Sequence, residues 1–455
     1  MFTTSIFNYY TNINRQSVIF NSMTEKIVRF IQEDLSTGKQ LLKFFEIAPE
    51  EEKKLLIDAG LIVKCGMDEN RVASVKFLDR IVNNDLYLTI MPTAECNFRC
   101  IYCYENQCGC ESFPPISMSE DIQTNIVRHV KMTLKERYCL LVEWHGGEPL
   151  LRTDIIDRLS QEFISVAMRD GKPYIATITT NGYYLTEDVV RLMLKNHVIK
   201  FHVTIDGFDW NHDYYRPDSN QNPTFKRIMD NLLAIKHKIK QRNFHVVLRT
   251  NVTKRFLPYL DQWLKYLSNN FSDDKRFQIY IKMVEDKGGG AIKKIENDLL
   301  ESEEAMFEIM LASKYRNNYE YYYPAICNSI CSAAMRNKHI IFPDGRIKKC
   351  GHYLFDLYSD VGVLKESGII EYDREHFSMW IKADKKRGEK CGNCPLWASC
   401  FNSFCPFKTS LFHNNIEPSV CSGEHQNIGR ILNLLLSPYN SGNIEVQKIG
   451  WRLNS

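Results

Sequence analysis

Three cysteines in one short loop constrain this chain more than any other feature. The run TAECNFRCIYCYEN carries Cys96, Cys100 and Cys103 at C-x3-C-x2-C spacing. Cysteine thiolates hold iron–sulfur clusters in proteins. Because no fourth cysteine stands at ligand spacing, three irons of a 4Fe-4S cluster would be held and the fourth left open for a small molecule. A zinc knuckle and a set of buried, metal-free thiols are the alternatives.

The composition narrows the class of protein. The chain has 455 residues, of which 44% are hydrophobic and 15 are cysteine, and its net charge is +3. The length suits two or three domains, and the balanced charge does not favour nucleic acid as a partner. We expect neither a signal peptide nor a membrane span, since no apolar run reaches ~18 residues. So many cysteines without a secretion signal indicate metal sites in a cytoplasmic protein rather than disulfides.

The central region alternates short apolar runs with amphipathic stretches of helical length. The predicted strands are Leu86–Pro92, Leu140–Trp144, Tyr174–Thr180, Lys200–Ile205, His245–Asn251 and Phe277–Val284. The predicted helices are Glu120–Glu136, Asp154–Met168, Asp188–Lys195, Phe225–Lys240 and Phe256–Leu267. This alternation implies an α/β fold with a parallel sheet and right-handed crossovers. Six units are too few for the closed eight-unit barrel and fit an open, partial (β/α)6 barrel.

Polar or glycine-rich motifs follow five of these strands. The cysteine loop follows the first strand, EWHGGEPL contains the end of the second, and TTNG, TIDG and RTNVT stand at the ends of the next three. In parallel α/β sheets, ligands sit at the carboxyl ends of the strands. The sequence therefore predicts a cofactor site at that end of the barrel.

The cysteine spacing, with the aromatic Tyr102 before the last cysteine, resembles the radical S-adenosylmethionine (radical SAM) family. The resemblance implies that the open iron binds the amino and carboxylate groups of SAM. Reductive cleavage of SAM then yields a 5′-deoxyadenosyl radical.

The same resemblance implies the residues that contact SAM, without naming a catalytic residue. The backbone of Tyr102 would contact adenine, and Gly146 and Gly147 would bind the amino group while Glu148 fixes their loop. Glu105 would shape the substrate pocket. His145 would contact SAM or substrate, or would only make hydrogen bonds within its own loop. The other candidates are Thr179, Asn181, Thr204 and Asp206 for ribose or methionine oxygens, Arg216 and Arg249 for the carboxylate, and Asn251.

Eight further cysteines lie between residues 327 and 421. Their C-x13-G-x4-C and C-x2-C-x5-C spacings resemble the SPASM extension, which implies two auxiliary 4Fe-4S clusters and three clusters in all. By position, one auxiliary cluster would use Cys327, Cys331, Cys350 and Cys405, and the other Cys391, Cys394, Cys400 and Cys421. Four residues precede Cys405 where the family has three, which weakens that assignment. A zinc ribbon is the alternative for the C-x2-C-x5-C run.

The first 85 residues carry a different pattern. SIFNYY and QSVIFN read as two strands joined by the turn TNIN. Ser22 is the predicted N-cap of a helix over Met23–Leu35, with Glu25 as its capping-box partner. Further helices are predicted over Gln40–Phe45 and Glu50–Ala59, the latter ending at Gly60. Such a module resembles the winged-helix-like peptide-recognition element of peptide-maturing radical SAM enzymes; the alternative is an extension that only packs on the barrel.

Together these features predict a radical SAM peptide maturase. We expect a recognition module at 1–85, the barrel at 86–300 and a linker with a Cys-rich SPASM domain at 301–455. The expected reaction joins a cysteine sulfur to a carbon of a ribosomally made precursor peptide, giving the thioether of sactipeptides or ranthipeptides. Flavodoxin or ferredoxin would supply electrons.

Three alternatives stay open. An anaerobic sulfatase maturase would form formylglycine, but that group carries an Asp after the cysteine that closes the C-x13-G-x4-C run, where this chain has Gly351 and His352. A maturase that forms carbon–carbon crosslinks or epimerises its peptide shares the same cofactors. A non-catalytic iron–sulfur regulator would not need a SAM site.

Overall fold

The computed structural model describes residues 1–30, 35–105, 116–284, 291–300, 331–352, 354, 357–381, 393–400, 428–429, 432, 436 and 444–448. The chain forms two compact units. The first comprises Met1–Val82, Tyr319–Met335 and Ile381–Ser455, and the second comprises Asn83–Asn318 and Arg336–Trp380. The two ends of the chain thus belong to one unit, and the central region to the other.

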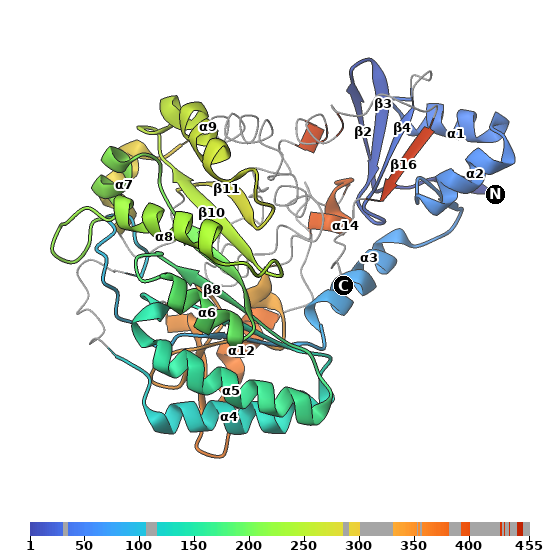
Figure 1. Ribbon diagram of the computed structural model, residues 1–455. Helices are drawn as coiled ribbons and strands as arrows, with labels where there is room; N and C mark the ends of the chain where they lie inside the picture. The colour runs from blue at the N-terminus through green and yellow to red at the C-terminus, as the bar shows by residue number, and fades with distance from the viewer. Residues whose placement is uncertain are drawn as a thin grey trace. The chain divides into compact units, whose positions relative to one another are not determined.

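The second unit contains the predicted barrel sheet (Figure 1). Its six parallel strands lie in chain order. They are β6 (Leu86–Ile90), β7 (Leu140–Trp144), β8 (Tyr174–Thr180), β9 (Val198–Thr204), β10 (His245–Val252) and β11 (Phe277–Met283). All six predicted strands are confirmed, with ends displaced by no more than two residues. The partial (β/α)6 arrangement follows from this order.

The helices between these strands also follow the predicted pattern. They are α4 (Glu120–Thr133) with η1 (Leu134–Glu136), α5 (Thr153–Asp170), α6 (Glu187–Lys195), α8 (Phe225–Lys238) and α9 (Leu260–Phe271). Side-chain caps fix two of their starts, because Ser119 accepts from the Ile122 N–H and Thr186 from the Val189 N–H. The predicted helix over Phe256–Leu267 begins as η3 (Leu257–Tyr259) and continues as α9. Short helices that the sequence did not predict are η2 (Pro149–Arg152), α7 (Asp209–Tyr215) and η4 (Ala291–Asp298).

The barrel strands bury their two faces to different degrees. Along β8, Tyr174, Ala176, Ile178 and Thr180 are buried, while the residues between them are half-buried. Helices α5 and α6 pack against β8 and β9 on the fully buried side. The half-buried side is called the inner face here, and its polar members include Glu143 on β7, Thr177 and Thr179 on β8, His202 on β9 and Arg249 on β10.

Residues 336–380 extend the barrel sheet past β6. Strand β12 (Lys338–Ile341) pairs in parallel with β6, and β13 (Arg346–Lys348), β14 (Asp360–Leu364) and β15 (Ile370–Tyr372) add antiparallel strands. Gly345, the glycine of the C-x13-G-x4-C run, closes the β12–β13 hairpin at φ +86°. Its place in the run is thus explained by a turn that needs positive φ. Helix α12 (Arg374–Ile381) follows β15.

The first unit is built on an antiparallel sheet in the order β16–β4–β3–β2. Its strands are β2 (Asn8–Ile13), β3 (Gln16–Asn21), β4 (Lys26–Phe30) and β16 (Ile444–Lys448). Asn14 and Arg15 form the β2–β3 turn with φ of 51° and 64°, as a two-residue type I′ hairpin requires. Around the sheet lie β1 (Phe2–Thr4), β5 (Ile62–Lys64), α1 (Gly38–Ile47), α2 (Glu50–Asp58) and α3 (Glu69–Ile81).

The predicted helix over Met23–Leu35 is wrong. Its central part is strand β4, which pairs with β3 from Asn21↔Lys26 to Ser17↔Phe30. The Asn21 side chain accepts from the N–H groups of Met23 and Thr24, which favours a turn over a helix start. Ser22 is not an N-cap; its hydroxyl donates to the Pro395 carbonyl at 2.6 Å. Pairing with β3 therefore overrides the weak helical periodicity of this stretch.

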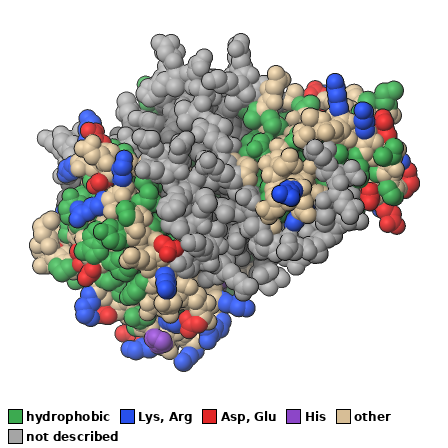
Figure 2. Space-filling view, turned by 90° about the horizontal axis from the view of Figure 1, so that it is seen from above, with side chains coloured by type: hydrophobic (Ala, Val, Ile, Leu, Met, Phe, Trp, Pro, Cys, Tyr) green, Lys and Arg blue, Asp and Glu red, His purple; other side chains and the backbone are tan. Residues whose placement is uncertain are grey.

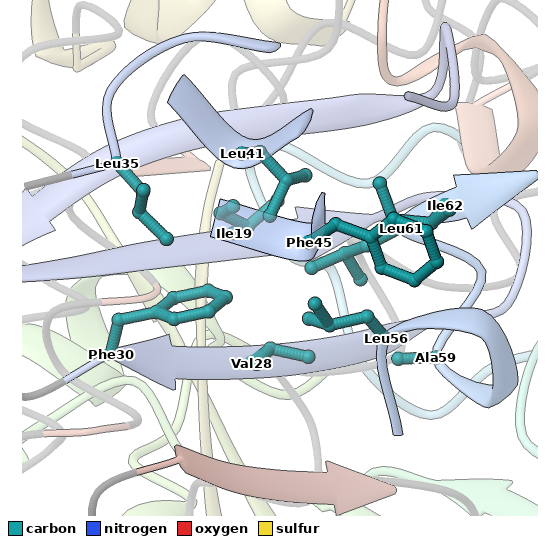
Figure 3. Packing of buried hydrophobic residues seen from close by; sticks show 10 residues of the cluster. All are labelled: Ile19, Val28, Phe30, Leu35, Leu41, Phe45, Leu56, Ala59, Leu61 and Ile62. Carbon is teal, nitrogen blue, oxygen red and sulfur yellow. The ribbon is translucent and has the colours of Figure 1, made fainter. Parts of the chain in front are cut away.

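Two apolar clusters hold the first unit together. In the cluster of Figure 3, Ile19 and Val28 of the sheet pack against Leu41 and Phe45 of α1 and Leu56 of α2. The second cluster joins distant parts of the chain, namely Phe7, Ala73, Phe77, Ile81, Ala334, Trp397 and Ala398. The helices α1 and α2, and the positive φ of 76° at Gly60, agree with the prediction for this part.

The described surface carries side chains of both charges (Figure 2). None of the described helices is long and apolar enough to cross a bilayer. On the face shown in Figure 2, Lys and Arg side chains are interspersed with Asp and Glu side chains over the described atoms. This distribution agrees with the small net charge of +3.

A buried ion pair supports the start of β11 and gives a test of the fold. The side chains of Arg276 and Asp274 are 3% and 8% exposed and lie 2.6 Å apart. Arg276 also donates to the carbonyl of Lys236 in the last turn of α8 and to two carbonyls of the loop that follows. We expect Arg276→Met to lower the free energy of unfolding by about 3–5 kcal/mol, because Asp274 would stay buried without its partner. Urea unfolding followed by circular dichroism measures the change.

Arg242→Met is the matched control. Arg242 also lies near Asp274, at 3.5 Å, but its side chain is 74% exposed. We expect its loss to cost about 0–1 kcal/mol, as for other surface pairs. Equal losses in the two variants would contradict the assigned role of the buried pair.

Candidate active site

Backbone hydrogen bonds hold the cysteine loop against the segment after α7. The N–H of Arg99 donates to Pro217 O at 2.9 Å, that of Ile101 to Tyr215 O at 3.0 Å, and that of Ser219 to Asn97 O at 2.8 Å. Between them Phe98 is fully buried, edge-on to the Tyr183 ring. The loop is therefore part of the folded core of the barrel unit.

The three thiols of this loop lie near one another and are half-buried. Burial raises the pKa of Cys96 to about 12, and it also raises the pKa of Cys100 and Cys103. The neighbouring thiols add to the shift in Cys96 and Cys103. Among the described side chains, no three His, Cys, Asp or Glu are close enough to hold one metal ion. A 4Fe-4S cluster suits such a set of donors, because each thiolate would bind a different iron and the three need not converge on one ion.

Two glycines after β7 allow the next loop to lie directly on the cysteine loop. The N–H groups of Gly147 and Glu148 donate to Thr93 O and Glu95 O at 3.3 and 2.8 Å. A Cβ on Gly146, which has φ +117°, would lie 2.5 Å from Thr93 O. A Cβ on Gly147 would overlap the Glu95 carbonyl and lie 2.7 Å from Ala94 O. Both positions thus need glycine for contact with the protein backbone, a reason that the sequence did not reveal.

Glu148 joins the ends of β7 and β8. It is fully buried and accepts from the Leu150 N–H at 3.0 Å, the Thr180 hydroxyl at 2.7 Å and the Asn181 N–H at 2.7 Å. Burial raises the pKa of this carboxyl, and these hydrogen bonds oppose the rise. The Asn181 amide then donates to Asn97 Oδ1 at 2.8 Å, which ties the β8 end to the cysteine loop.

Asp206 forms a second buried centre at the ends of β9 and β10. One carboxylate oxygen accepts from the Tyr102 hydroxyl, and the other accepts from the Asn251 N–H at 2.9 Å. The Tyr102 oxygen in turn accepts from Arg216 Nη1 at 3.1 Å and Asn251 Nδ2 at 3.2 Å. Tyr102, Asp206, Arg216 and Asn251 therefore form one network that links the cysteine loop to two strand ends.

The two arginines predicted to bind the SAM carboxylate differ in the hydrogen bonds that they already make. Arg216 is 8% exposed, and its Nε has no hydrogen-bond partner and lies 4.0 Å from Asp206. Arg249 is half-buried, and its Nε donates to Asn251 Oδ1 at 2.8 Å. A buried guanidinium N–H without a partner fits a site completed by an anionic ligand group such as the SAM carboxylate.

Thr179 and Thr204 lie at the ends of β8 and β9, in register with His202 and Arg249. Their assignment to SAM, like those of the other strand-end residues, stays a prediction.

Three further residues of the site, Asn97, Asn211 and His212, were not predicted from the sequence. Asn211 donates to Asp206 O at 2.6 Å, and His212 Nδ1 accepts from the Asp206 N–H at 3.1 Å. The short helix α7 that carries them has too little periodicity to be predicted.

A histidine and a carboxylate meet beside the cysteine loop. His145 Nδ1 lies 3.4 Å from Glu105 Oε1. Burial raises the pKa of Glu105, and His145 opposes the rise. Two residues before His145, on β7, Glu143 accepts from the Thr89 hydroxyl at 3.0 Å and lies 3.8 Å from Lys338.

Three of the predicted auxiliary-cluster cysteines have described surroundings. Cys350 is buried after β13 in the second unit, where its N–H donates to the Ser359 hydroxyl at 3.4 Å. Cys331 and Cys394 belong to the first unit, and the Cys394 carbonyl accepts from the Trp397 N–H at 3.1 Å. Cys400 ends the short helix α14 (Trp397–Cys400). Cys327, Cys391, Cys405 and Cys421 lie outside the described residues.

Sequence comparison finds a known superfamily that matches the part of the chain carrying this site. Residues 90–262 match the family model described as the radical SAM superfamily. An uncharacterized protein of Methanocaldococcus jannaschii is 28% identical over 189 residues, 41% of this chain and 60% of that protein. The cysteine-type anaerobic sulfatase-maturating enzyme of Clostridium novyi is 25% identical over 379 residues, 75% of this chain and 92% of the enzyme. The serine-type enzyme of Bacteroides thetaiotaomicron is 22% identical over 378 residues, 75% of this chain and 88% of the enzyme.

Solved structures agree on the fold. Native anSMEcpe with bound AdoMet has a TM-score of 0.58 at 18% identity, covering 78% of this chain and 100% of that chain. Streptococcus suis SuiB bound to precursor peptide SuiA has a TM-score of 0.52 at 15% identity, covering 92% of this chain and 98% of that chain. The predicted fold class is therefore confirmed.

The contact between Gly147 and the cysteine loop can be tested by one added methyl group. We expect Gly147→Ala to displace the loop, because the new Cβ would meet the Glu95 and Ala94 carbonyls. If the displacement weakens cluster binding by about 1.4 kcal/mol, the affinity of the loop for an iron–sulfur cluster falls about tenfold. The measurement is the electron paramagnetic resonance signal that responds to SAM in the reduced, reconstituted protein.

Gly171→Ala serves as the control for that experiment. Gly171 ends α5 at φ +62° with no atom within 4 Å of an added Cβ. Its substitution should cost about 1–2 kcal/mol of stability through backbone strain alone and leave the SAM-responsive signal intact. A full signal in Gly147→Ala would contradict the loop contact.

Proposed function

Because this chain carries a radical SAM domain, we propose that it is a peptide maturase that joins a cysteine sulfur to a carbon of a ribosomally made precursor peptide. The observation that supports the proposal is the half-buried three-thiol loop at the carboxyl ends of the barrel strands, near Arg216, whose Nε has no partner among the described residues. When bound, the cluster and SAM supply the 5′-deoxyadenosyl radical. The chain's own contribution is to position the substrate and to manage its protons and charge.

The residues of the site fit SAM in distinct ways. Cys96, Cys100 and Cys103 would hold the cluster, and the Nε of Arg216 would meet the SAM carboxylate. The Asp206 and Glu148 centres would fix the strand ends, so that Asn181, Asn251 and the two threonines stand ready for polar groups of the ligand. Fixed groups of this kind bind without reorganising at the moment of reaction.

Two auxiliary clusters belong to the proposal as well. Cys327, Cys331, Cys350 and Cys405 would hold one and Cys391, Cys394, Cys400 and Cys421 the other, giving three clusters with the SAM-binding one. The proposed domains are a recognition module at 1–85, the barrel at 86–300 and the SPASM domain at 301–455. Flavodoxin or ferredoxin in the cytoplasm would be the electron donor.

A second candidate function is that of an anaerobic sulfatase-maturating enzyme. It is favoured by the two relatives of that name, each of which matches 75% of this chain. Gly351 after Cys350 speaks against it, since this position has no side chain to act as a base. A maturase forming carbon–carbon links is a further option with the same cofactors.

Mass spectrometry of the peptide distinguishes these functions. The probe is a Cys-rich peptide encoded beside this chain, incubated without oxygen with reconstituted protein, SAM and dithionite. We expect a loss of two hydrogens per modified site and thiols that no longer alkylate. Loss of two hydrogens with all thiols free would indicate carbon–carbon links instead, and an aldehyde on a sulfatase-derived cysteine peptide would favour the second candidate.

The control variants for that experiment are Cys100→Ala and Cys65→Ala. Cys100 is in the cluster loop, and its loss should abolish both product and 5′-deoxyadenosine. Cys65 is exposed in the first unit, and its loss should change neither. Product formed by Cys100→Ala would contradict a radical SAM reaction.

We also propose that the first unit binds the precursor peptide along the edge of β4. That edge accepts an added strand, because β16 from the end of the chain pairs with it from Ile444↔Phe30 to Lys448↔Lys26. Peptides commonly bind proteins by adding a strand to a sheet edge. SuiB, whose fold is similar, has been solved with precursor peptide SuiA. Deleting residues 1–85 is a poor test, since Phe7 and Phe77 share a core with Trp397.

A shorter truncation gives a sharper test of peptide binding. A chain ending at Asn443 lacks β16, while a chain ending at Lys448 retains it. An attached strand competes at an effective concentration in the millimolar range, so we expect the shorter chain to bind a fluorescein-labelled precursor peptide at least about tenfold more tightly. Fluorescence anisotropy measures the affinity. Equal affinity of both chains would exclude the β4 edge as the binding place.

A further inference from the structure

A line of ionisable side chains runs along the inner face of β7 toward the cysteine loop. Glu143 lies on β7, and His145 is the first residue after that strand. Glu143 is in register with Thr89 and Thr177, which belong to the neighbouring strands. Glu105, directly after the cysteine loop, completes the line through its contact with His145. The proposed SAM contacts do not use any of these three.

The geometry of His145 and Glu105 suits an oriented base. The Glu105 carboxylate lies 3.4 Å from Nδ1 of His145, and the two side chains are 14% and 20% exposed. The His145 backbone N–H donates to Ile90 O at 3.0 Å, so the start of the side chain is fixed. With Nδ1 facing a carboxylate, Nε2 is left to accept a proton. Among the described residues, Nε2 has no hydrogen-bond partner.

The pair also lies at the place where the reaction would occur. The charge of Glu105 acts on Cys96, Cys100 and Cys103, so the carboxylate is close to all three thiols. Tyr104, which precedes it, packs edge-on to the His352 ring at 5.4 Å between centroids. The pair therefore stands beside the proposed cluster, on the face of the sheet that faces away from the helices.

The proposed reaction needs a proton acceptor at this place. A cysteine thiol that forms a bond to carbon must lose its proton. The residue after Cys350, where sulfatase maturases carry an acid, is Gly351 and has no side chain. The acceptor must come from another part of the chain.

We propose that His145 is the base that accepts the proton of the substrate thiol and that Glu105 is its positioning residue. In this step the S–H bond breaks, the proton moves to Nε2 of His145, and the sulfur keeps the electron pair as a thiolate. The imidazolium that forms is stabilised by the Glu105 carboxylate. The inference rests on the proposed function, because it needs a substrate with a thiol.

The experiment compares wild-type protein with His145→Gln on the peptide that the wild type modifies. General bases contribute about 10²–10⁴-fold in rate, so we expect thioether formation to fall by at least about 100-fold. Formation of 5′-deoxyadenosine, and transfer of deuterium to it from a peptide labelled at the acceptor carbon, should stay within about threefold. His237→Gln, on the exposed side of α8, is the matched control and should match the wild type in all three readouts.

Two further readouts separate a base from a structural residue. A selenocysteine peptide is already deprotonated at neutral pH, so its coupling should be nearly as fast in His145→Gln as in the wild type. Glu105→Gln should slow thioether formation while 5′-deoxyadenosine formation stays unchanged, because the imidazole loses the carboxylate that faces its Nδ1. Glu105→Asp should restore most of the wild-type coupling rate.

Each outcome decides the proposal. Equal coupling rates in His145→Gln and the wild type would overturn it and leave the maturase function standing. A parallel fall of 5′-deoxyadenosine and product would also overturn it, since His145 would then act on SAM cleavage. Wild-type protein that cleaves SAM but modifies no thiol in the peptide would overturn the proposed function and the base together. A His145→Gln variant that does not fold is replaced by Glu105→Gln, where an unchanged coupling rate would overturn the proposal.

Discussion

The structure of the site depends on the close approach of two loops, the cysteine loop after β6 and the glycine loop after β7. The carbonyls of Thr93 and Glu95 accept from the N–H groups of Gly147 and Glu148, at separations that leave no room for a Cβ on either glycine. This contact fixes where the three thiols stand with respect to the strand ends. Because His145 precedes the glycines, it also fixes the histidine beside Glu105.

Two buried carboxylates connect these loops to the ends of the neighbouring strands. Glu148 connects the glycine loop with the end of β8, and Asp206 connects Tyr102 of the cysteine loop with β9 and β10. A buried polar network rigidifies a site only when its members are satisfied. Among the described residues, Nε of Arg216 and Oδ1 of Asn211 beside Asp206 have no hydrogen-bond partner. The unsatisfied Arg216 donor marks a place where an anionic ligand group would complete the network.

The first unit shows a different principle, because it is assembled from both ends of the chain. Phe7 and Phe77 pack with Trp397, the Ser22 hydroxyl donates to Pro395, and β16 pairs with β4. The loop that carries Cys394 is therefore anchored on the N-terminal sheet. The proposed peptide-binding edge and the loop that carries Cys394 would therefore depend on one hydrophobic core.

The sequence alone determined the parts of this protein that repeat or that stand at fixed spacing. The six barrel strands and five main helices follow from period-two and period-3.6 patterns, because each element must bury one face. The cluster loop followed from the spacing of Cys96, Cys100 and Cys103. The tertiary structure decided what depends on contacts between distant residues. Strand β4 replaced a predicted helix because β3 offered it a partner, and Gly147 proved to face a backbone carbonyl. Glu105 contacts His145 because their loops follow adjacent strands, and no local sequence pattern predicts that contact.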